Sequence, residues 1–229
     1  MTEDAHPAPQ PTRPRYRRRR APLGEHVAAV IAGLQRRYRD DAPEAIAVLA
    51  RLRRAVNEAP GGASIREACH LPEEVTRHEY LPQDEPSFSE QALHTTVTLW
   101  ALHQQSRREK PMHTGGTTFA AAIRRLALAS PNEETVYRRF TALGTASTYS
   151  ELTFHARGIV AQLRDAQIGF DYGLLADDLR TFQRGMEAST GLSGPERVRA
   201  LWGREYWRIE PESSPTENSK TAASSDEQE

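Results

Sequence analysis

Cysteine, lysine and long apolar runs are scarce in this chain of 229 residues. Cys69 is the single cysteine, so no disulfide can form within the chain and a reducing compartment is expected. No apolar run approaches the roughly 18 residues that a membrane-spanning helix needs, and the N-terminus lacks the apolar core of a signal peptide. We therefore expect a soluble, cytoplasmic protein with no membrane contact.

Motifs of the common enzyme and metal-binding classes are also missing. There is no Walker-type phosphate loop, nucleophile elbow or zincin motif. Cys69-His70 and His78 resemble part of a metal site, but no second ligand pair has the spacing of a zinc site. We interpret the histidines of the predicted helices as interior or rim residues: His94, His103 and His155. No metal and no cofactor is expected.

Charge is distributed unevenly along the chain. The sequence contains 28 Arg but only 2 Lys, and its formal net charge is −1. Residues 1–23 carry a net +4 and residues 210–229 a net −5, so the segment between them is neutral. Because neither end can bury an apolar face, we predict a disordered basic, Pro-rich head (1–22) and a disordered acidic tail (210–229).

Apolar residues between the head and the tail recur at helical spacing, and no stretch shows the alternation of a strand. Pro43 suits the first turn of a helix, Ser130-Pro131-Asn132 offers a cap, and Asp171 suits an N-cap. A long helix is predicted from Ser89 to Arg107. Residues 57–87, rich in Pro and Gly, predict loop with short helical turns. The sequence thus predicts an all-α fold of two helical bundles, an N-terminal domain (23–130) and a C-terminal bundle (131–209).

Arginine occurs in five doublets, mostly within the predicted helices: Arg36-Arg37, Arg53-Arg54, Arg107-Arg108, Arg124-Arg125 and Arg138-Arg139. An adjacent pair covers a broad arc of the polar face of a helix, because each residue turns the helix by about 100°. Repeated on several helices, such pairs suit a polyanion. Solvated faces and salt bridges would produce the same pattern, and both interpretations stay open.

The last third of the chain adds arginine stripes. Arg197, Arg204 and Arg208 fall within about 40° of one another on their helix, and such stripes can bind phosphates. A surface ion pair is the alternative for Arg180, since Asp177 precedes it by three residues. The nearby aromatic residues could stack on bases, but their helical spacing favours the core: Trp202, Tyr206 and Trp207.

Two charged residues fall on apolar arcs of predicted helices. The Arg53 side chain must extend its guanidinium group to solvent, form an ion pair, or lie where the helix has already ended. Asp178 lies between Leu174 and Leu175, and a buried Asp at such a position is interpreted as a structural partner for an Arg or a backbone donor.

A catalytic alternative comes from one short motif. Arg108 and His113 match the R-x4-H spacing of a family of helical ribonucleases, in which the two side chains line a cleft. Here the motif spans Pro111 and runs into Gly115-Gly116, which predicts a mobile loop that would position catalytic groups poorly. We therefore predict no catalytic residues.

Five segments, in order, resemble those of a known family. Residues 49–54 (LARLRR) resemble its early helix, and 136–143 (VYRRFTAL) resemble its RRF-x-x-L helix. Residues 151–160, 171–179 and 197–204 resemble its later motifs EL-x-x-H-x-RG-L-V, DY-x-x-LA-x-DL and RVR-x-x-W-x-R. Over residues 25–208 the chain resembles the CasB family, the small subunit of the type I-E CRISPR Cascade surveillance complex.

This resemblance implies a two-domain helical protein without enzymatic activity. Family members are present as two copies packed head to tail, where they contact the crRNA-bearing backbone and the large subunit. Basic residues there help hold the displaced strand and the target DNA strand, and so stabilise the R-loop, while guide pairing reads sequence. The same role in antiviral defence is implied here, with a protein-only helical adaptor as a further alternative.

The resemblance also implies which arginines contact nucleic acid. Carried over position by position, they are Arg53, Arg54, Arg138, Arg139, Arg157, Arg197, Arg199 and Arg204. Helix-face geometry alone adds Arg124, Arg125 and Arg180.

Overall fold

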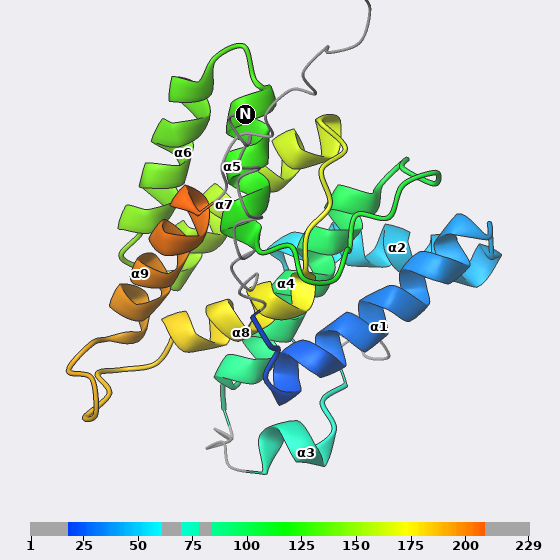
Figure 1. Cartoon of the computed structure of the whole chain (residues 1–229). Coiled ribbons are helices and arrows are strands. Elements are labelled where there is room, and N and C mark those ends of the chain that lie inside the picture. Colours follow the sequence, from blue (N-terminus) through cyan, green and yellow to red (C-terminus); the bar gives the residue numbers. More distant parts are fainter. Residues whose placement is uncertain (1–17, 61–69, 78–83, 209–229) are drawn as a thin grey trace, which may run out of the picture.

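The computed structural model of the chain describes residues 18–60, 70–77 and 84–208 (Figure 1). These residues form helices and no strand; one isolated bridge pairs His113 with Phe170. The prediction of an all-α fold is confirmed. Residues 1–17 and 209–229, which hold most of the predicted head and tail, lie outside the described residues, as do Cys69 and His78.

The helices follow the predicted order along the chain. Their bounds are α1 (Pro22–Arg39), α2 (Pro43–Arg54), the 3-10 helix η1 (Ala55–Asn57), α3 (Glu73–Thr76), α4 (Phe88–Gln104), α5 (Phe119–Ala129), α6 (Glu133–Thr145), α7 (Tyr149–Asp165), α8 (Tyr172–Phe182) and α9 (Gly194–Trp207).

Local capping chemistry explains where several helices begin. Within the predicted capping segment 130–132, Asn132 is the residue that caps α6, by accepting a hydrogen bond of 3.0 Å from the Thr135 N–H. Ser193 and Glu196 form a capping box at the start of α9. The predicted extension of the fourth helix to Arg107 is wrong, because the backbone leaves the helix at Gln105 and turns left-handed at Ser106. The doublet Arg107-Arg108 therefore lies in a loop.

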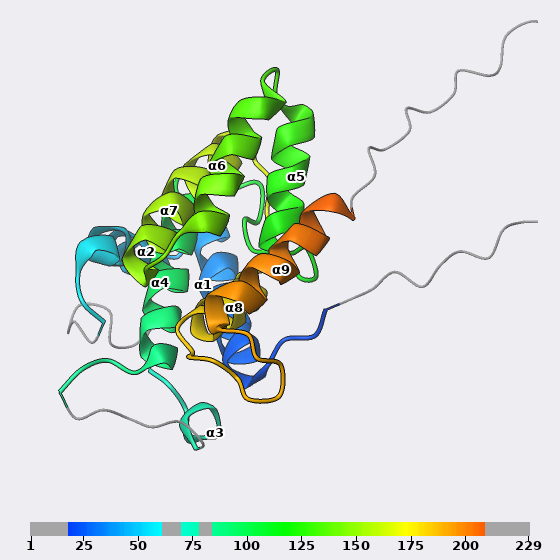
Figure 2. The ribbon, with the colours of Figure 1, turned by 90° about the vertical axis from the view of Figure 1, so that its left-hand side faces the viewer.

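Helix α8 lies at the centre of the packing. It contacts α1, α4 and α9, and residues 171–179 are all buried (Figures 1 and 2). Its apolar side chains join those of α1, α4, α5 and α9 in one hydrophobic core. Because α1 and α4 precede residue 130 and α8 follows it, contacts run across the predicted domain boundary. The division into 23–130 and 131–209 remains a prediction.

The N-terminus of α1 crosses α8 at two glycines. A Cβ at Gly24 would overlap the Asp177 carboxylate and the Gly173 carbonyl, and one at Gly173 would overlap the Gly24 carbonyl. The absence of both side chains lets the two helices meet backbone to backbone. Glycine at these two positions is therefore required by the close approach.

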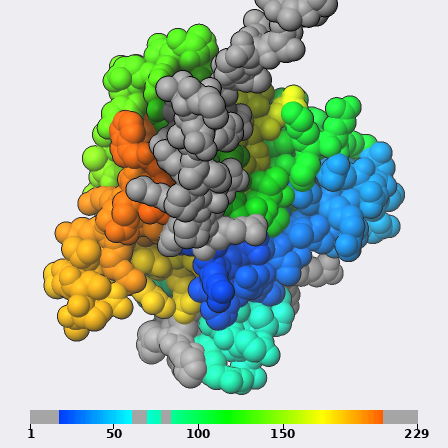
Figure 3. Space-filling view, viewed as in Figure 1, coloured from blue at the N-terminus to red at the C-terminus, as the bar shows by residue number. Residues whose placement is uncertain are grey.

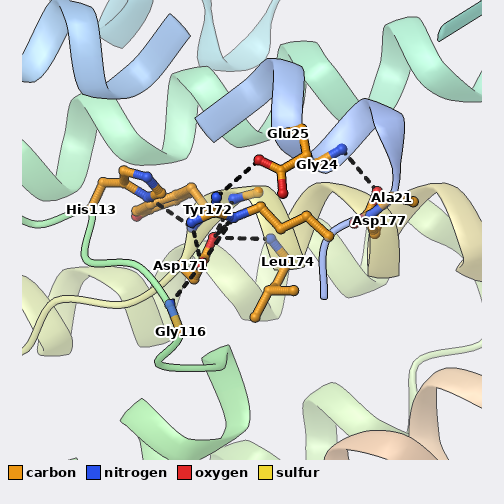
Figure 4. Close-up of polar contacts among 11 residues, drawn as sticks. Ala21, Gly24, Glu25, His113, Gly116, Asp171, Tyr172, Leu174 and Asp177 are labelled. Carbon is orange, nitrogen blue, oxygen red and sulfur yellow. Dashed lines mark hydrogen bonds and ion pairs between the residues drawn. The ribbon is translucent and has the colours of Figure 1, made fainter. Parts of the chain in front are cut away.

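Asp177 of α8 caps α1 from outside that helix. No side chain at Ala21 caps α1, but Asp177 accepts hydrogen bonds from the Ala21 N–H (2.7 Å) and the Gly24 N–H (2.9 Å; Figure 4). A carboxylate there also faces the positive end of the helix dipole. Burial raises the pKa of Asp177 to about 6. The predicted surface ion pair with Arg180 is thus wrong, because the Asp177 carboxylate is buried against α1.

Asp171 holds three separate segments together. It caps α8 through the Gly173 and Leu174 N–H groups and accepts a hydrogen bond of 2.8 Å from the Gly116 N–H (Figure 4). Arg20 donates to both of its carboxylate oxygens, at 2.9 and 2.7 Å. Burial alone would raise the pKa of Asp171, but the hydrogen bonds and charge of Arg20 hold it below its ordinary value.

Arg18 and Asp178 form the most buried ion pair between described residues. The Arg18 guanidinium pairs with both oxygens of Asp178, which also accepts a hydrogen bond of 2.8 Å from the Trp202 indole N–H of α9. Glu205 lies 3.6 Å from the same guanidinium. Asp178 is thus the structural partner that its sequence position predicts. The expectation of a disordered head is wrong for residues 18–22, which are anchored on α8. We call the residues that anchor them the N-terminal clasp: Arg18, Arg20, Asp171, Asp177 and Asp178.

We predict that Arg18→Ala lowers the free energy of unfolding by about 3 kcal/mol, because it leaves Asp178 buried without its cation. The neighbouring Arg19 is exposed, so Arg19→Ala should change stability by no more than about 0.5 kcal/mol. Urea denaturation of both variants measures the difference. Equal stability of the two variants would contradict the clasp.

Candidate nucleic-acid interface

Three of the predicted nucleic-acid-binding arginines bind other parts of the protein. Arg157 of α7 donates to the Asn57 side chain (2.9 Å) and the Val56 carbonyl (3.0 Å), which ties α7 to the end of η1. Arg197 pairs with Glu187 at 2.6 Å. Arg199 donates to the Ala146 carbonyl at 2.7 Å. These three guanidinium groups are thus engaged within the fold, although Arg199 remains exposed.

Arg124 is also bound within the fold, although part of its side chain reaches the surface. It forms an ion pair with Glu133 of α6, and its guanidinium sits over the rings of Tyr206 and Trp207, 5.4 and 5.5 Å from their centroids. Only 14% of its side chain is exposed. Burial alone would lower its pKa, but the contacts with Glu133 and Tyr206 raise it, so Arg124 stays charged. It joins α5, α6 and α9.

Other predicted arginines extend into solvent. Arg125, Arg139 and Arg204 are exposed on α5, α6 and α9. Arg138 and Arg54 are also exposed and bind only weakly to their own helices, at 3.3 Å to the Thr135 hydroxyl and the Ala50 carbonyl. These five guanidinium groups are accessible to a ligand.

Two predicted site residues occupy intermediate positions. Arg53 is half-buried in the last turn of α2, where a cation is favourable because the exposed carbonyl groups of the helix end carry partial negative charge. A position at the end of the helix is one of the possibilities that the sequence of this segment leaves open for Arg53. Arg180 is half-buried in the last turn of α8.

Helices α5, α6 and α9 pack on one another and carry an excess of positive charge, as α1 and α2 also do with six Arg against two Glu. Helices α5, α6 and α9, together with Arg208, carry eight Arg against four Glu, whereas the whole chain has a net charge of −1. Helices α6 and α9 lie next to each other on the left of the surface in Figure 3. The structure therefore brings together three of the predicted arginine sets, 124–125, 138–139 and 197–204, while Arg53-Arg54 lie apart on α2.

Sequence reasoning missed two features of this region. The spacing of Trp202, Tyr206 and Trp207 favoured the core for all three, but Trp207 is 63% exposed while Trp202 and Tyr206 are buried. The second feature is the binding of Arg18 and Arg20, which belong to the predicted head, to Asp178 of α8 and to its N-cap Asp171, both of which are buried. A buried carboxylate needs a cationic or hydrogen-bonding partner, and that requirement was the available signal.

The R-x4-H motif does not form a catalytic cleft. His113 is 9% exposed, and its Nδ1 accepts a hydrogen bond of 3.2 Å from the Tyr172 N–H. Its backbone N–H donates to Gln35, so the predicted mobility of this loop is wrong at His113. Burial lowers the pKa of His113 and favours the neutral ring. Arg108, by contrast, lies outside, paired with Asp41 and over the ring of Tyr38.

His103 of α4 suits a structural role. His103 is fully buried, its Nδ1 lies 3.0 Å from the Tyr172 hydroxyl, and burial lowers its pKa to about 3. No group of three or more His, Cys, Asp or Glu that could hold a metal ion occurs among residues 18–60, 70–77 and 84–208. None of the helices in these ranges is long and apolar enough to cross a membrane.

Comparison with known proteins identifies the family. The family model of CRISPR-associated protein Cse2 matches residues 48–207, more than half of the chain. The chain belongs to the Cse2 family. CasB from Thermobifida fusca, a solved structure, is 35% identical to it with a TM-score of 0.63, over 82% of this chain and 99% of that chain. The family resemblance predicted from the sequence motifs is confirmed.

A second solved structure shares the fold. A chain of a CRISPR RNA-guided surveillance complex is 20% identical, with a TM-score of 0.57, over 81% of this chain and 94% of that chain. None of the curated proteins compared with this chain matches it. The segment matched by the Cse2 model contains the clasp residues of α8, whereas Arg18 and Arg20 precede it.

We predict that His113→Ala lowers the free energy of unfolding by about 2 kcal/mol, because it leaves the buried Tyr172 N–H without its acceptor. Arg108→Ala removes an exposed ion pair and should cost no more than about 1 kcal/mol. Thermal unfolding of the two variants tests this. Metal-independent RNA cleavage that is lost in a folded His113→Ala protein would contradict the structural role and restore the ribonuclease alternative.

Proposed function

We propose that this Cse2-family chain is the non-catalytic small subunit of a type I-E CRISPR Cascade complex, and that it holds single-stranded nucleic acid beside the guide duplex. Family membership supports the first part, as does the shared fold with a chain of a CRISPR RNA-guided surveillance complex. The second part depends on the arginines.

The excess of positive charge on the packed helices α5, α6 and α9, eight Arg against four Glu with Arg208 included, is the observation that carries the nucleic-acid role. Guanidinium groups bind phosphate oxygens in pairs and stack on bases, and neither contact encodes sequence. That chemistry suits a subunit that stabilises strands while guide pairing supplies specificity. The crRNA, the target DNA strand and the displaced strand of the R-loop are the proposed ligands.

The arginines that bind within the fold narrow the set of ligand contacts. Arg157, Arg197 and the exposed Arg199 would have to exchange protein partners for phosphate. This favours, as contact residues, the exposed arginines that bind no other element of the described chain: Arg54, Arg125, Arg138, Arg139 and Arg204. The backbone subunits, the large subunit and a second copy of this chain, packed head to tail, are the proposed protein partners.

The two alternatives from the sequence fare differently. A ribonuclease that uses Arg108 and His113 is disfavoured, because the imidazole of His113 is buried against Tyr172. A protein-only adaptor would use the exposed arginines for acidic partners. Binding of single strands by the isolated chain distinguishes that alternative from the proposal.

We predict that the isolated chain binds single-stranded DNA and RNA of unrelated sequences with similar affinity. For four phosphate contacts, the slope of log affinity against log salt should be near −3, since each contact on a single strand contributes about −0.7. Fluorescence anisotropy of labelled 20-nucleotide strands at several salt concentrations measures the slope. A slope near zero, or a strong preference for one sequence, would contradict the proposal.

A pair of charge-matched variants localises the contacts. Reversal of Arg125, Arg139 and Arg204 to Glu should lower the affinity at least tenfold, since charge-assisted contacts to phosphate are lost. The control reverses three exposed arginines on other elements to Glu: Arg36, Arg51 and Arg77. Equal losses in the two triple variants would indicate an effect of net charge, and the assignment to α5, α6 and α9 would be wrong.

A further inference from the structure

One large aromatic ring stands on the charged surface at the end of α9. Trp207 is 63% exposed, whereas the other two tryptophans, Trp100 and Trp202, are at most 2% exposed. Tyr137 of α6 is 37% exposed, and its ring centroid lies 5.9 Å from that of Trp207. Two aromatic rings from different helices are thus accessible side by side.

The underlying residues fix these rings in place. Tyr206 is fully buried, stacks on Phe140 at 4.4 Å, and meets Trp207 edge to face at 5.1 Å. Arg124 lies over the indole ring at 5.5 Å and is itself held by Glu133. Three helices therefore position the indole ring, and a ligand that stacks on it meets a preformed surface.

The charges around the rings favour an anionic ligand. Arg204 is exposed one turn before Trp207 on α9, so both side chains lie on the same face of that helix. Glu133 pairs with Arg124, whereas Arg204 forms no ion pair with any residue of 18–60, 70–77 or 84–208. An exposed aromatic ring beside guanidinium groups is the arrangement by which proteins bind single strands, with bases on the ring and phosphates on the cations. An apolar protein partner would have to desolvate those arginines.

We propose that Trp207, with Tyr137 beside it, is a stacking platform for an unpaired base of single-stranded nucleic acid, and that Arg204 binds an adjacent phosphate. This inference rests on the proposed nucleic-acid role and adds a specific contact to it. The stacking is tolerant of sequence, because every base presents an aromatic face. Bases in a duplex are already stacked on one another and are not available to the platform.

Tryptophan fluorescence offers a direct test in the intact chain. Because Trp100 and Trp202 are buried, quenching by an added strand reports mainly on Trp207. The probes are a 20-nucleotide oligodeoxythymidine and an abasic strand of the same length, which keeps the phosphates and removes the bases. We expect the thymidine strand to quench the fluorescence and the abasic strand to leave it nearly unchanged.

Variants separate stacking from electrostatic binding. Trp207→Ala should lower affinity for the thymidine strand about tenfold and leave affinity for the abasic strand unchanged, while Trp207→Phe restores part of the loss. The control is Phe154→Ala on α7, since Phe154 is 73% exposed and its ring contacts His155. This variant should bind both strands like the unaltered chain. Melting temperatures verify that each variant is folded.

The possible failures are distinguishable. If Trp207→Ala lowers the affinity for both strands equally, or for neither, the proposed stacking platform is wrong, while the proposed electrostatic binding still holds. If the unaltered chain binds neither strand, the proposed nucleic-acid role itself fails. If Trp207→Ala binds strands normally but is lost from the assembled complex, Trp207 is a protein contact and the stacking platform is overturned.

Discussion

The buried carboxylates of α8 are the constraint on which the rest of the structure depends. Asp171, Asp177 and Asp178 stand on a helix that is covered on every side, so each needs a partner to offset its loss of hydration. Arg20, the N-terminus of α1 and Arg18 provide those partners, and the Trp202 indole of α9 shares Asp178. The same helix thereby fixes the start of α1 and the position of α9, which carries the exposed Arg204 and Trp207.

Arginine has two physical roles in this chain. Where its five N–H groups meet carboxylates or carbonyl oxygens within the fold, as at Arg18 and Arg157, it connects segments that are distant in sequence. Where the guanidinium group is exposed and binds no other described residue, as at Arg125 and Arg204, it is accessible to phosphate. Net charge conceals this division, because it does not distinguish an arginine that is bound within the fold from one that is exposed. The proposed role in strand binding belongs to the second group alone.

The predictable features are those set by nearby residues. The helices, the caps at Asn132 and Asp171, and the structural role of Asp178 follow from spacing and side-chain chemistry. Partners far away along the chain were not predictable: Arg18 and Asp178 are 160 residues apart, and Arg157 and Val56 are 101 apart. The spacing of Trp207 on its helix predicts a core residue, because spacing alone does not show how far around a helix the buried face extends. In the structure Trp207 lies at the edge of that face, where its ring meets Tyr137 of α6. A single sequence therefore predicts the elements better than the surface on which function depends.

Arginine-specific chemical modification, read by mass spectrometry with and without a saturating single strand, tests the division of the arginines most directly. We expect Arg125, Arg139 and Arg204 to react rapidly in the free chain and to be protected by the strand. Arg18, Arg20 and Arg157 should react slowly in both states, because their guanidinium groups are bound within the fold. The exposed Arg36 and Arg51 should react rapidly in both states. Protection of Arg36 and Arg51, with Arg125, Arg139 and Arg204 left reactive, would contradict the assignment of the nucleic-acid surface to α5, α6 and α9.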